Sequence, residues 1–505
     1  MTVQVDGHSL TIVDVEAVAK GEAKVSLPAD AAKRIREGRK RLERIVAEGK
    51  VAYGVNTGVG ELRTVCIPQE DLRELQANLV RSTACGVGEP LPIEVVRAMM
   101  LLRANALSSG LSGVRPELVQ LLVDMLNANV VPVVPSRGSV GSSGDLVPLA
   151  HMALPLIGEG EVFLEGRRMD GADALLAIGL SPVVLEAKEG LALINGTQMM
   201  TAIGCLCLSE AERLVDATIA GAAMSVEALK GTPHAFDERL FKARPHPGAV
   251  EVAKRMREML ANSKIAASHA GCKEVQDAYT LRCVPQVVGA CVDSLAFARE
   301  AVRRELNAVT DNPLIFEGGA VSGGNFHGQP IAMALDQACL AVHVLGAFSE
   351  RRTARLLDGK LSHLPDFLVE SEGLESGMMI LQYTAAGLVS ENKLLASPAS
   401  ADSLPTSANQ EDYNSMGSVS ALKLMQTVEN ARSIVAIELI CATQALDFQK
   451  LMPGKGAEAA RKHVRSVVKR LRTDRKMSGD IESVAALISA DAFSRESLLR
   501  SARKG

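Results

Sequence analysis

The order of apolar and polar residues along the chain predicts a mostly helical protein. Residues 29–49 form a charged amphipathic pattern, and residues 93–107 and 116–129 repeat apolar residues at three- and four-residue spacing, as one face of an α-helix requires. After about residue 285 such patterns become long, at 286–308, 328–358, 374–395 and 416–448. Since no alternating strand patterns separate them, the sequence predicts an all-α fold dominated by a bundle of long helices.

The N-terminal part is less regular than the bundle. It begins with the alternating segment HSLTIVDV and continues through shorter helical patterns that are broken by loops. We therefore place a boundary near residue 215, between a mainly helical N-terminal domain (1–215) and a long-helix bundle domain (216–505). The chain of 505 residues is long enough for two such domains.

Charge and cysteine content narrow the classes of partner. The net charge of −4 and the lack of a basic stripe with interleaved aromatic residues argue against nucleic-acid binding. The uncharged stretch 190–209 could span a bilayer, but its polar residues and the lack of flanking basic clusters favour a buried core helix with a polar entrance, so we expect no membrane segment.

The N-terminus has no signal-peptide pattern, and the nine cysteines are odd in number and lack zinc-site spacing. We expect reduced thiols, no metal and a cytoplasmic protein.

The stretch RGSVGSSGDL, residues 137–146, places three glycines and three serines between two apolar segments. A phosphate-binding loop would need a following Lys-Ser/Thr or a strand–turn–helix unit, and both are missing. A serine-nucleophile elbow would need the spacing GxSxG, which this stretch does not have. The third possibility is backbone chemistry, in which the amide nitrogen of Gly144 attacks the carbonyl carbon of Ser142, because glycine has no Cβ to block the approach. Loss of water would close a five-membered ring, and dehydration of Ser143 would leave a conjugated methylene, so the chain itself would become an electrophile.

Aromatic residues are scarce, at 3% of the chain, and tryptophan is absent. All four tyrosines nevertheless lie in or beside motif-like stretches, at positions 53, 279, 383 and 413. Tyr53 lies in AYGVNTGVG, next to polar residues and three glycines. A hydroxyl-bearing ring that is kept there favours a role in chemistry or substrate contact over core packing.

The segment GSVGSSGDLVPLAH resembles the signature GSxGASGDLxPLAH of the histidine and aromatic amino acid ammonia-lyase family. The resemblance continues in order over nearly the whole chain, through YGVNTGVG (53–60), NGTQ (195–198), VQDAYTLRCVPQ (275–286), TDNPLIF (310–316), SGGNFHGQP (322–330), ENK (391–393) and TSANQEDYNSMG (406–417). It implies an all-α fold and a methylidene-imidazolone prosthetic group that forms autocatalytically from Ser142-Ser143-Gly144. It also implies a homotetramer whose active sites draw on several subunits, with no metal and no nucleotide cofactor.

The same resemblance implies roles for the residues around this prosthetic group. Tyr53 would be the base that removes a β-proton from the substrate, which requires its surroundings to lower a phenol pKa of about 10. Arg282 would bind the substrate carboxylate through its bidentate guanidinium. Asn195 and Tyr279 would hold the carboxylate or the amine-loaded electrophile.

Three further positions complete the set that the resemblance implies. Gln276 would orient the carboxylate network, and Phe326 would pack on the prosthetic group. Glu411 would face the substrate ring or take up the amine proton. Because an unpaired buried carboxylate is costly, Glu411 favours a ring that carries a proton donor, such as an imidazole or a phenol.

The sequence departs from the family pattern at two places. Ser142 stands where the family usually has alanine, and a serine is compatible with ring closure because the reaction uses the backbone carbonyl of that residue. The pair Ser82-Thr83, a candidate substrate-binding pair, does not match cleanly the residues typical of histidine-, tyrosine- or phenylalanine-specific members. We rank histidine or a histidine derivative first as substrate, and tyrosine or phenylalanine second.

The sequence therefore predicts a carbon–nitrogen lyase that eliminates ammonia from a ring-bearing L-amino acid and gives an α,β-unsaturated acid. Two alternatives stay open at this point. A 2,3-aminomutase on the same scaffold would return the amine to the β-carbon, and a catalytically inactive helical binding protein would form no electrophile.

Overall fold

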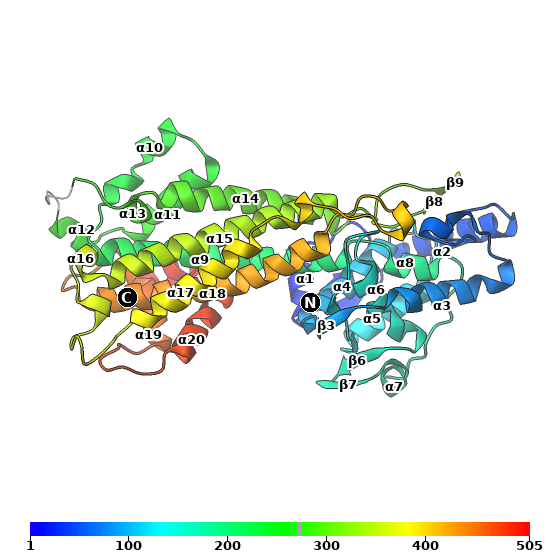
Figure 1. Ribbon diagram of the computed structural model, residues 1–505, viewed down its shortest axis with the longest axis horizontal. Coiled ribbons are helices and arrows are strands. Elements are labelled where there is room, and N and C mark those ends of the chain that lie inside the picture. The colour runs from blue at the N-terminus through cyan, green and yellow to red at the C-terminus, as the bar shows by residue number, and fades with distance from the viewer. Residues whose placement is uncertain (270–274, 505) are drawn as a thin grey trace. The chain divides into compact units, whose positions relative to one another are not determined.

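A computed structural model describes residues 1–269 and 275–504, and α-helices dominate this part of the chain (Figure 1). The all-α prediction is confirmed. The helices are α1 (Ile12–Ala19), α2 (Ala29–Ala47), α3 (Leu72–Thr83), α4 (Ile93–Leu107), α5 (Pro116–Asn127), α6 (Leu146–Ala153), α7 (Gly171–Ala177), α8 (Glu189–Ile194), α9 (Gln198–Ala228), α10 (Glu238–Ala243), α11 (Pro247–Met259), α12 (Lys264–Ser268), α13 (Tyr279–Arg282), α14 (Val284–Glu305), α15 (Gln329–Leu357), α16 (Gly359–Ser362), α17 (Met379–Leu395), α18 (Gly417–Leu446), α19 (Lys455–Val467), α20 (Ser478–Ser489) and α21 (Arg495–Lys504).

Helices occur where the hydrophobic periodicity predicted them. The patterns at 29–49, 93–107 and 116–129 become α2, α4 and α5, and the four long patterns become α14, α15, α17 and α18. The segment 8–15 instead leads into α1, because the hydroxyl of Thr11 accepts a hydrogen bond from the Asp14 backbone and the Asp14 carboxylate accepts one from the Thr11 backbone. Local capping thus overrides a short alternation.

The uncharged stretch 190–209 is buried as expected, but it does not form one helix. Helix α8 ends at Ile194 and α9 begins at Gln198. Between them Asn195 has extended backbone dihedrals and Gly196 has φ +155°. This break turns the Gly196 carbonyl out of the helical direction, and its consequence appears in the functional site.

The strands are short and belong to small, separate sheets. Strand β1 (Thr2–Gln4) pairs with β2 (Lys24–Ser26) in parallel, and β3 (Val87–Pro90) pairs antiparallel with β5 (Pro135–Arg137). Strand β6 (Glu161–Leu164) lies antiparallel between β4 (Val131–Pro132) and β7 (Arg167–Asp170), with Val162 opposite Met169. Strands β8 (Leu314–Phe316) and β9 (Gly319–Val321) form a hairpin. These strands hold the loops of the irregular part in place.

The described chain divides into two compact units. The first unit contains Met1–Leu206, Ala298–Asp336 and Pro398–Leu422, and the second contains Cys207–Phe297, Gln337–Ser397 and Lys423–Gly505. Two later segments therefore group with the N-terminal part of the chain. The boundary near residue 215 stays a prediction.

The long helices are apolar because they pack in the interior of the protein. Helix α15 is long and apolar enough to cross a bilayer by length and composition, yet most of its apolar window is buried in the protein.

Five cysteines are buried, at positions 205, 207, 291, 339 and 441, whereas Cys66 and Cys85 are exposed and Cys272 lies outside the described residues. Burial raises the pKa of Cys205 and of Cys291 to about 12, so these thiols stay protonated and unreactive at neutral pH.

A buried carboxylate joins three long helices of the second unit. Glu438 on α18 is fully buried and pairs with the fully buried Arg352 on α15, with nitrogen–oxygen distances of 2.5 and 2.7 Å. Ser225 on α9 and Ser349 on α15 each donate a hydroxyl hydrogen bond to the same carboxylate, at 2.9 and 2.5 Å. Each carboxylate oxygen therefore holds two donors, which compensates for the loss of hydration.

We expect Glu438→Gln to lower the free energy of unfolding by about 3 kcal/mol, because it leaves the Arg352 charge buried without its counter-ion. The midpoint of urea denaturation would measure the loss. The matched control is Glu238→Gln, which breaks the exposed Lys242–Glu238 pair of the same unit and should leave the midpoint unchanged. Equal midpoints for all three proteins would contradict a structural role for the buried pair.

Candidate active site

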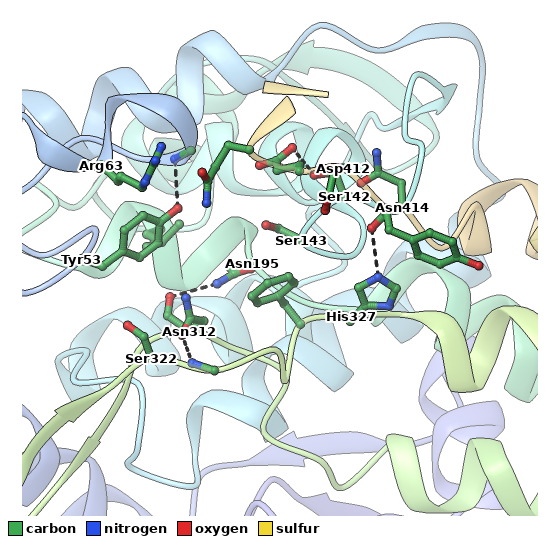
Figure 2. Close-up of a pocket in the computed structure, with 17 residues that line it drawn as sticks. Tyr53, Arg63, Ser142, Ser143, Asn195, Asn312, Ser322, His327, Asp412 and Asn414 are labelled. Carbon is green, nitrogen blue, oxygen red and sulfur yellow. Dashed lines mark hydrogen bonds between the residues drawn. The ribbon is translucent and has the colours of Figure 1, made fainter. Parts of the chain in front are cut away.

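One cavity of about 390 Å³ in the first unit brings together six of the residues singled out in the sequence (Figure 2). These six are Tyr53, Ser142, Ser143, Asn195, Phe326 and Glu411. The other lining residues are Gly60, Arg63, Leu191, Asn312, Ser322, Gly323, His327, Gln410, Asp412, Tyr413 and Asn414. The wall is therefore built from five separate stretches of the sequence, at 53–63, 142–143, 191–195, 312–327 and 410–414.

The loop with three serines forms a tight turn at the cavity wall. Ser143 has φ +47°, and Gly141 and Gly144 both have φ +78°, so three residues of four adopt left-handed backbone conformations. Such a conformation is strained for a serine and strongly favours glycine at the neighbouring positions. The Ser139 hydroxyl donates to the Gly144 carbonyl at 3.3 Å and accepts from the Gly141 backbone at 3.2 Å. The turn is thus held from inside by its first serine.

Gly144 packs directly on the backbone of Gly196, at the break between α8 and α9. A β-carbon on residue 144 would stand 2.0 Å from the Gly196 carbonyl oxygen, so no other residue fits. The two segments exchange backbone hydrogen bonds, from Asp145 N–H to the Gly196 carbonyl at 2.6 Å and from Gly196 N–H to the Ser143 carbonyl at 3.1 Å. The turn and the neighbouring Asn195 are therefore placed by the same contact.

Asp145 anchors the end of the turn in the protein interior. Its carboxylate accepts hydrogen bonds from the Met200 backbone N–H at 3.0 Å, in the first turn of α9, and from the Ser418 hydroxyl at 2.7 Å, in the first turn of α18. Burial raises the pKa of Asp145 to about 6, against the effect of these donors. The carboxylate is still mostly ionised at pH 7, where the positive end of the α9 dipole also favours it.

The residues of this turn fit the prosthetic group that the family resemblance implies. Ring closure needs a nitrogen without a neighbouring β-carbon, and the close approach to Gly196 leaves room only for glycine at residue 144. It also needs the chain to bend back on itself, which the left-handed dihedrals of Ser143 and Gly144 provide. The Ser143 side chain, which would lose water, lines the cavity.

Asn195 lines the cavity, and the two ends of its side-chain amide differ in their hydrogen bonding. Its side-chain nitrogen donates to the Asp311 carboxylate at 3.1 Å and to the Asn312 carbonyl at 3.0 Å, and both partners are pure acceptors. Since only the amide nitrogen can donate to these two acceptors, the contacts themselves show which end of the side chain is nitrogen and which is oxygen. The side-chain oxygen of Asn195 is buried and has no hydrogen-bond partner within the described part of the chain. This oxygen can therefore accept a hydrogen bond from a bound molecule.

A buried ion pair stands behind Asn195. Lys188 and Asp311 are both fully buried, and the Lys188 nitrogen lies 2.9 and 2.8 Å from the two Asp311 oxygens. Burial opposes ionisation of Asp311, but the charges of Lys188 and Arg103 outweigh it and hold the pKa of that carboxyl below its usual value. Arg103 in turn donates to the Asn195 backbone carbonyl at 2.7 Å. The acceptor that orients the amide is thus a permanent anion.

Tyr53 is half-buried, and its oxygen accepts a hydrogen bond from the Gly60 backbone N–H at 3.0 Å, marked by a dashed line in Figure 2. The prediction that the surroundings lower the Tyr53 pKa is wrong, because the groups of this chain raise that pKa. Burial raises the pKa of Tyr53, the Glu411 carboxylate raises it further, and the Gly60 donor only partly offsets them. The phenol is therefore protonated at neutral pH in these surroundings.

Glu411 belongs to a short loop that is closed by a backbone pair. The Thr406 and Glu411 peptides exchange hydrogen bonds at 2.9 and 3.3 Å. The hydroxyls of Thr406, at 2.8 Å, and of Ser142 both donate to one oxygen of the Glu411 carboxylate. The family position at which this chain carries serine is thus in direct contact with a candidate catalytic residue.

Six candidates are not among the residues that line the cavity. One of them is Gly144, which follows Ser143 in the same turn and packs on Gly196. Ser82 and Thr83 end α3 in the first unit, and the exposed Ser82 donates only a 3.5 Å bond to the Leu79 carbonyl. The exposed Gln276 and Tyr279 and the partly buried Arg282 belong to the second unit. The Arg282 guanidinium lies over the Tyr279 ring, with 4.8 Å from its carbon to the ring centroid, and its Nε is buried without a partner in the described residues.

The structure adds cavity residues that were not assigned a role from the sequence. Arg63 brings a cation, and Asn312 brings a side-chain amide whose oxygen accepts a hydrogen bond from the Gly323 backbone at 2.7 Å. His327 stacks on Tyr413, with 6.2 Å between ring centroids, and hydrogen-bonds the Tyr413 carbonyl at 3.2 Å. Tyr413 was detectable as one of the scarce tyrosines, whereas nothing in the local sequence distinguishes Arg63. No group of three metal-ligating side chains occurs among the described residues.

Comparisons with known proteins agree on a single family. The family model described as "Aromatic amino acid lyase" matches residues 10–466. The chain is 50% identical over 487 residues to the histidine ammonia-lyase of Myxococcus xanthus (strain DK1622), covering 96% of each chain.

Solved structures show the same similarity. The crystal structure of histidine ammonia-lyase from Trypanosoma cruzi superposes with a TM-score of 0.91 and 41% identity, covering 100% of this chain and 95% of that one. A tyrosine aminomutase from Streptomyces globisporus superposes with a TM-score of 0.93 and 38% identity, covering 100% of this chain and 99% of that one. The chain therefore belongs to the aromatic amino acid lyase family.

Proposed function

We propose that this protein is a histidine ammonia-lyase, a carbon–nitrogen lyase that converts L-histidine into ammonia and an imidazole-bearing α,β-unsaturated acid. The observation that carries the proposal is the Glu411 carboxylate in the wall of the cavity that also holds Tyr53, Ser143 and Asn195. A carboxylate beside a substrate ring favours a ring with an N–H donor and disfavours an apolar one. The names of the relatives at about 50% identity support the same substrate.

The proposed prosthetic group is a methylidene-imidazolone formed by Ser142, Ser143 and Gly144. When formed, it supplies an electrophilic carbon that helps a poor leaving group, the amine, to depart. The chain's own residues hold the turn in the bent conformation that this requires, through Gly196 and Asp145. We assign Phe326, which lines the same cavity, to packing on the prosthetic group and excluding water.

The remaining residues divide the work of elimination. In its deprotonated form, the Tyr53 oxygen takes the β-proton while the Cα–N bond breaks and the Cα–Cβ double bond forms. The free Asn195 oxygen accepts an N–H of the substrate amine, since its own nitrogen is already used by Asp311 and Asn312. Glu411 accepts the ring N–H. We assign Arg282 to the substrate carboxylate, with Tyr279 and Gln276 supporting it.

We also propose a cytoplasmic homotetramer whose active sites draw on several subunits, with no metal, no nucleotide, no nucleic acid and no membrane as partners. Its only small-molecule partner is the amino acid substrate. The family resemblance supports the tetramer, and the division of the candidates between a pocket in the first unit and a helix of the second unit is compatible with it.

The substrate is tested with purified protein and L-histidine, L-tyrosine and L-phenylalanine in separate reactions. We expect ammonia and a new ultraviolet band from L-histidine, and neither product from Ser143→Ala, which cannot form the methylene. A β-amino acid without free ammonia would identify a 2,3-aminomutase instead, an activity that the similarity to a tyrosine aminomutase makes worth measuring. Absence of any product would favour the inactive binding protein.

Tyr53→Phe should lower kcat by roughly 100- to 10,000-fold, the contribution of a general base, while the protein keeps its fold. The base is the Tyr53 phenolate, and its fraction increases as the pH rises. Because burial and Glu411 raise the pKa of Tyr53, this increase continues into the alkaline range. The kcat/KM of the wild type should therefore climb with pH through neutrality and into the alkaline range. A profile that is flat from pH 6 to 9, or a Tyr53→Phe variant with wild-type kcat, would contradict the assignment.

Shared active sites are tested by mixing two inactive variants. Tyr53→Phe changes the first unit and Arg282→Ala the second. If one site takes these residues from different subunits, co-expression of both chains will assemble some sites with both residues intact and restore part of the activity. If each site uses one chain only, every site will lack one residue and the mixture will stay inactive.

A further inference from the structure

Ser142 differs from the usual family residue, alanine, by one hydroxyl group, and that hydroxyl has a definite partner. The residue is only 8% exposed. Its hydroxyl donates to Oε2 of Glu411, across 269 residues of sequence. A buried hydroxyl that donates to a carboxylate restricts the carboxylate's rotation.

The Glu411 side chain is consequently held at one oxygen and open at the other. Oε2 accepts from both Ser142 and Thr406, whereas no hydrogen bond to Oε1 occurs within the described residues. Oε1 lies toward Gly60, 3.8 Å from where a β-carbon on that glycine would stand, and Gly60 is the donor to Tyr53. The free oxygen therefore faces the part of the cavity that contains the candidate base.

We propose that Ser142 is a specificity-determining positioning residue, which holds Glu411 so that Oε1 remains a fixed acceptor for a ring N–H. The inference rests on the proposed function, because it concerns how the same site selects an imidazole. With alanine at this position Glu411 would keep only the Thr406 donor, and its carboxylate could turn away from the ring. Substrates whose ring lacks a donor gain nothing from the fixed oxygen.

This role is separate from formation of the prosthetic group. Ring closure uses the backbone carbonyl of residue 142 and leaves its side chain outside the ring. The Ser142→Ala variant carries the residue usual in the family and should still become two waters lighter than its own sequence. Intact mass therefore reports on ring formation independently of activity.

The test compares kcat/KM for L-histidine with kcat/KM for L-phenylalanine in several variants. We expect Ser142→Ala and Thr406→Val each to lower this ratio about tenfold, the effect of losing one hydrogen bond to a charged group. Most of the loss should be in KM for L-histidine, since the ring contact exists before the chemical step. Ser142→Thr retains a hydroxyl and should retain most of the ratio.

The matched control is Ser407→Ala, which removes a hydroxyl from the same loop without touching the Glu411 carboxylate. Among the described residues, the Ser407 hydroxyl oxygen accepts one hydrogen bond, from the Glu61 backbone N–H at 3.1 Å. A general loosening of the loop would lower the ratio in this variant as well, and that result would overturn the proposal.

A binding measurement completes the test without catalysis. Calorimetry with the imidazole-bearing unsaturated acid should show that Ser142→Ala weakens binding about tenfold in the wild-type background and less than about twofold in Glu411→Gln, where the anion is gone. Equal effects in both backgrounds, an unchanged ratio in Ser142→Ala, or a Ser142→Ala protein of unmodified mass would each contradict the proposal. A wild type that is inactive on L-histidine would instead refute the proposed function itself.

Discussion

Gly144 lies so close to Gly196 that a β-carbon at residue 144 would stand 2.0 Å from the Gly196 carbonyl oxygen. This backbone contact, closed by hydrogen bonds in both directions, brings two segments about fifty residues apart into one wall. Because Ser143 precedes Gly144 and Asn195 precedes Gly196, the same contact aims both side chains into the cavity. The proposed electrophile and its nearest polar neighbour are therefore placed by the main chain, whose position does not depend on rotamers.

Buried charge then fixes what the main chain has placed. Asp145 ties the turn to the first turns of α9 and α18, and Asp311 of the Lys188–Asp311 pair accepts one of the two hydrogen bonds that the Asn195 side chain donates. Removing one partner of such a pair generally costs about 3–5 kcal/mol, far more than a surface ion pair contributes. These particular desolvated charges lie directly behind the cavity wall, where a displacement of a fraction of an ångström would affect catalysis most.

Much of the fold could be predicted from the hydrophobic pattern, because long and mostly apolar helices such as α15 and α18 continue one pattern over many turns. The break at 195–197 could not be, since the residues on both sides are apolar and buried, and only the docking of the serine turn requires it. The six candidate residues that line the cavity could be predicted from the sequence, because they lie in motifs that are recognised by residue type. Arg63 was missed for the opposite reason, since an exposed arginine in a short 3-10 helix has no distinctive local pattern. The pKa direction of Tyr53 and the Ser142–Glu411 bond depend on contacts between distant segments, which no local pattern reports.

The central claim is that residues 142–144 become a reagent made from the backbone, and mass spectrometry tests it most directly. We would measure the intact mass of the purified wild type and then map the peptide that contains these residues. The account predicts a protein two waters lighter than its sequence, with the whole loss confined to that peptide. An unmodified peptide 142–144 in protein that releases ammonia from L-histidine would contradict it.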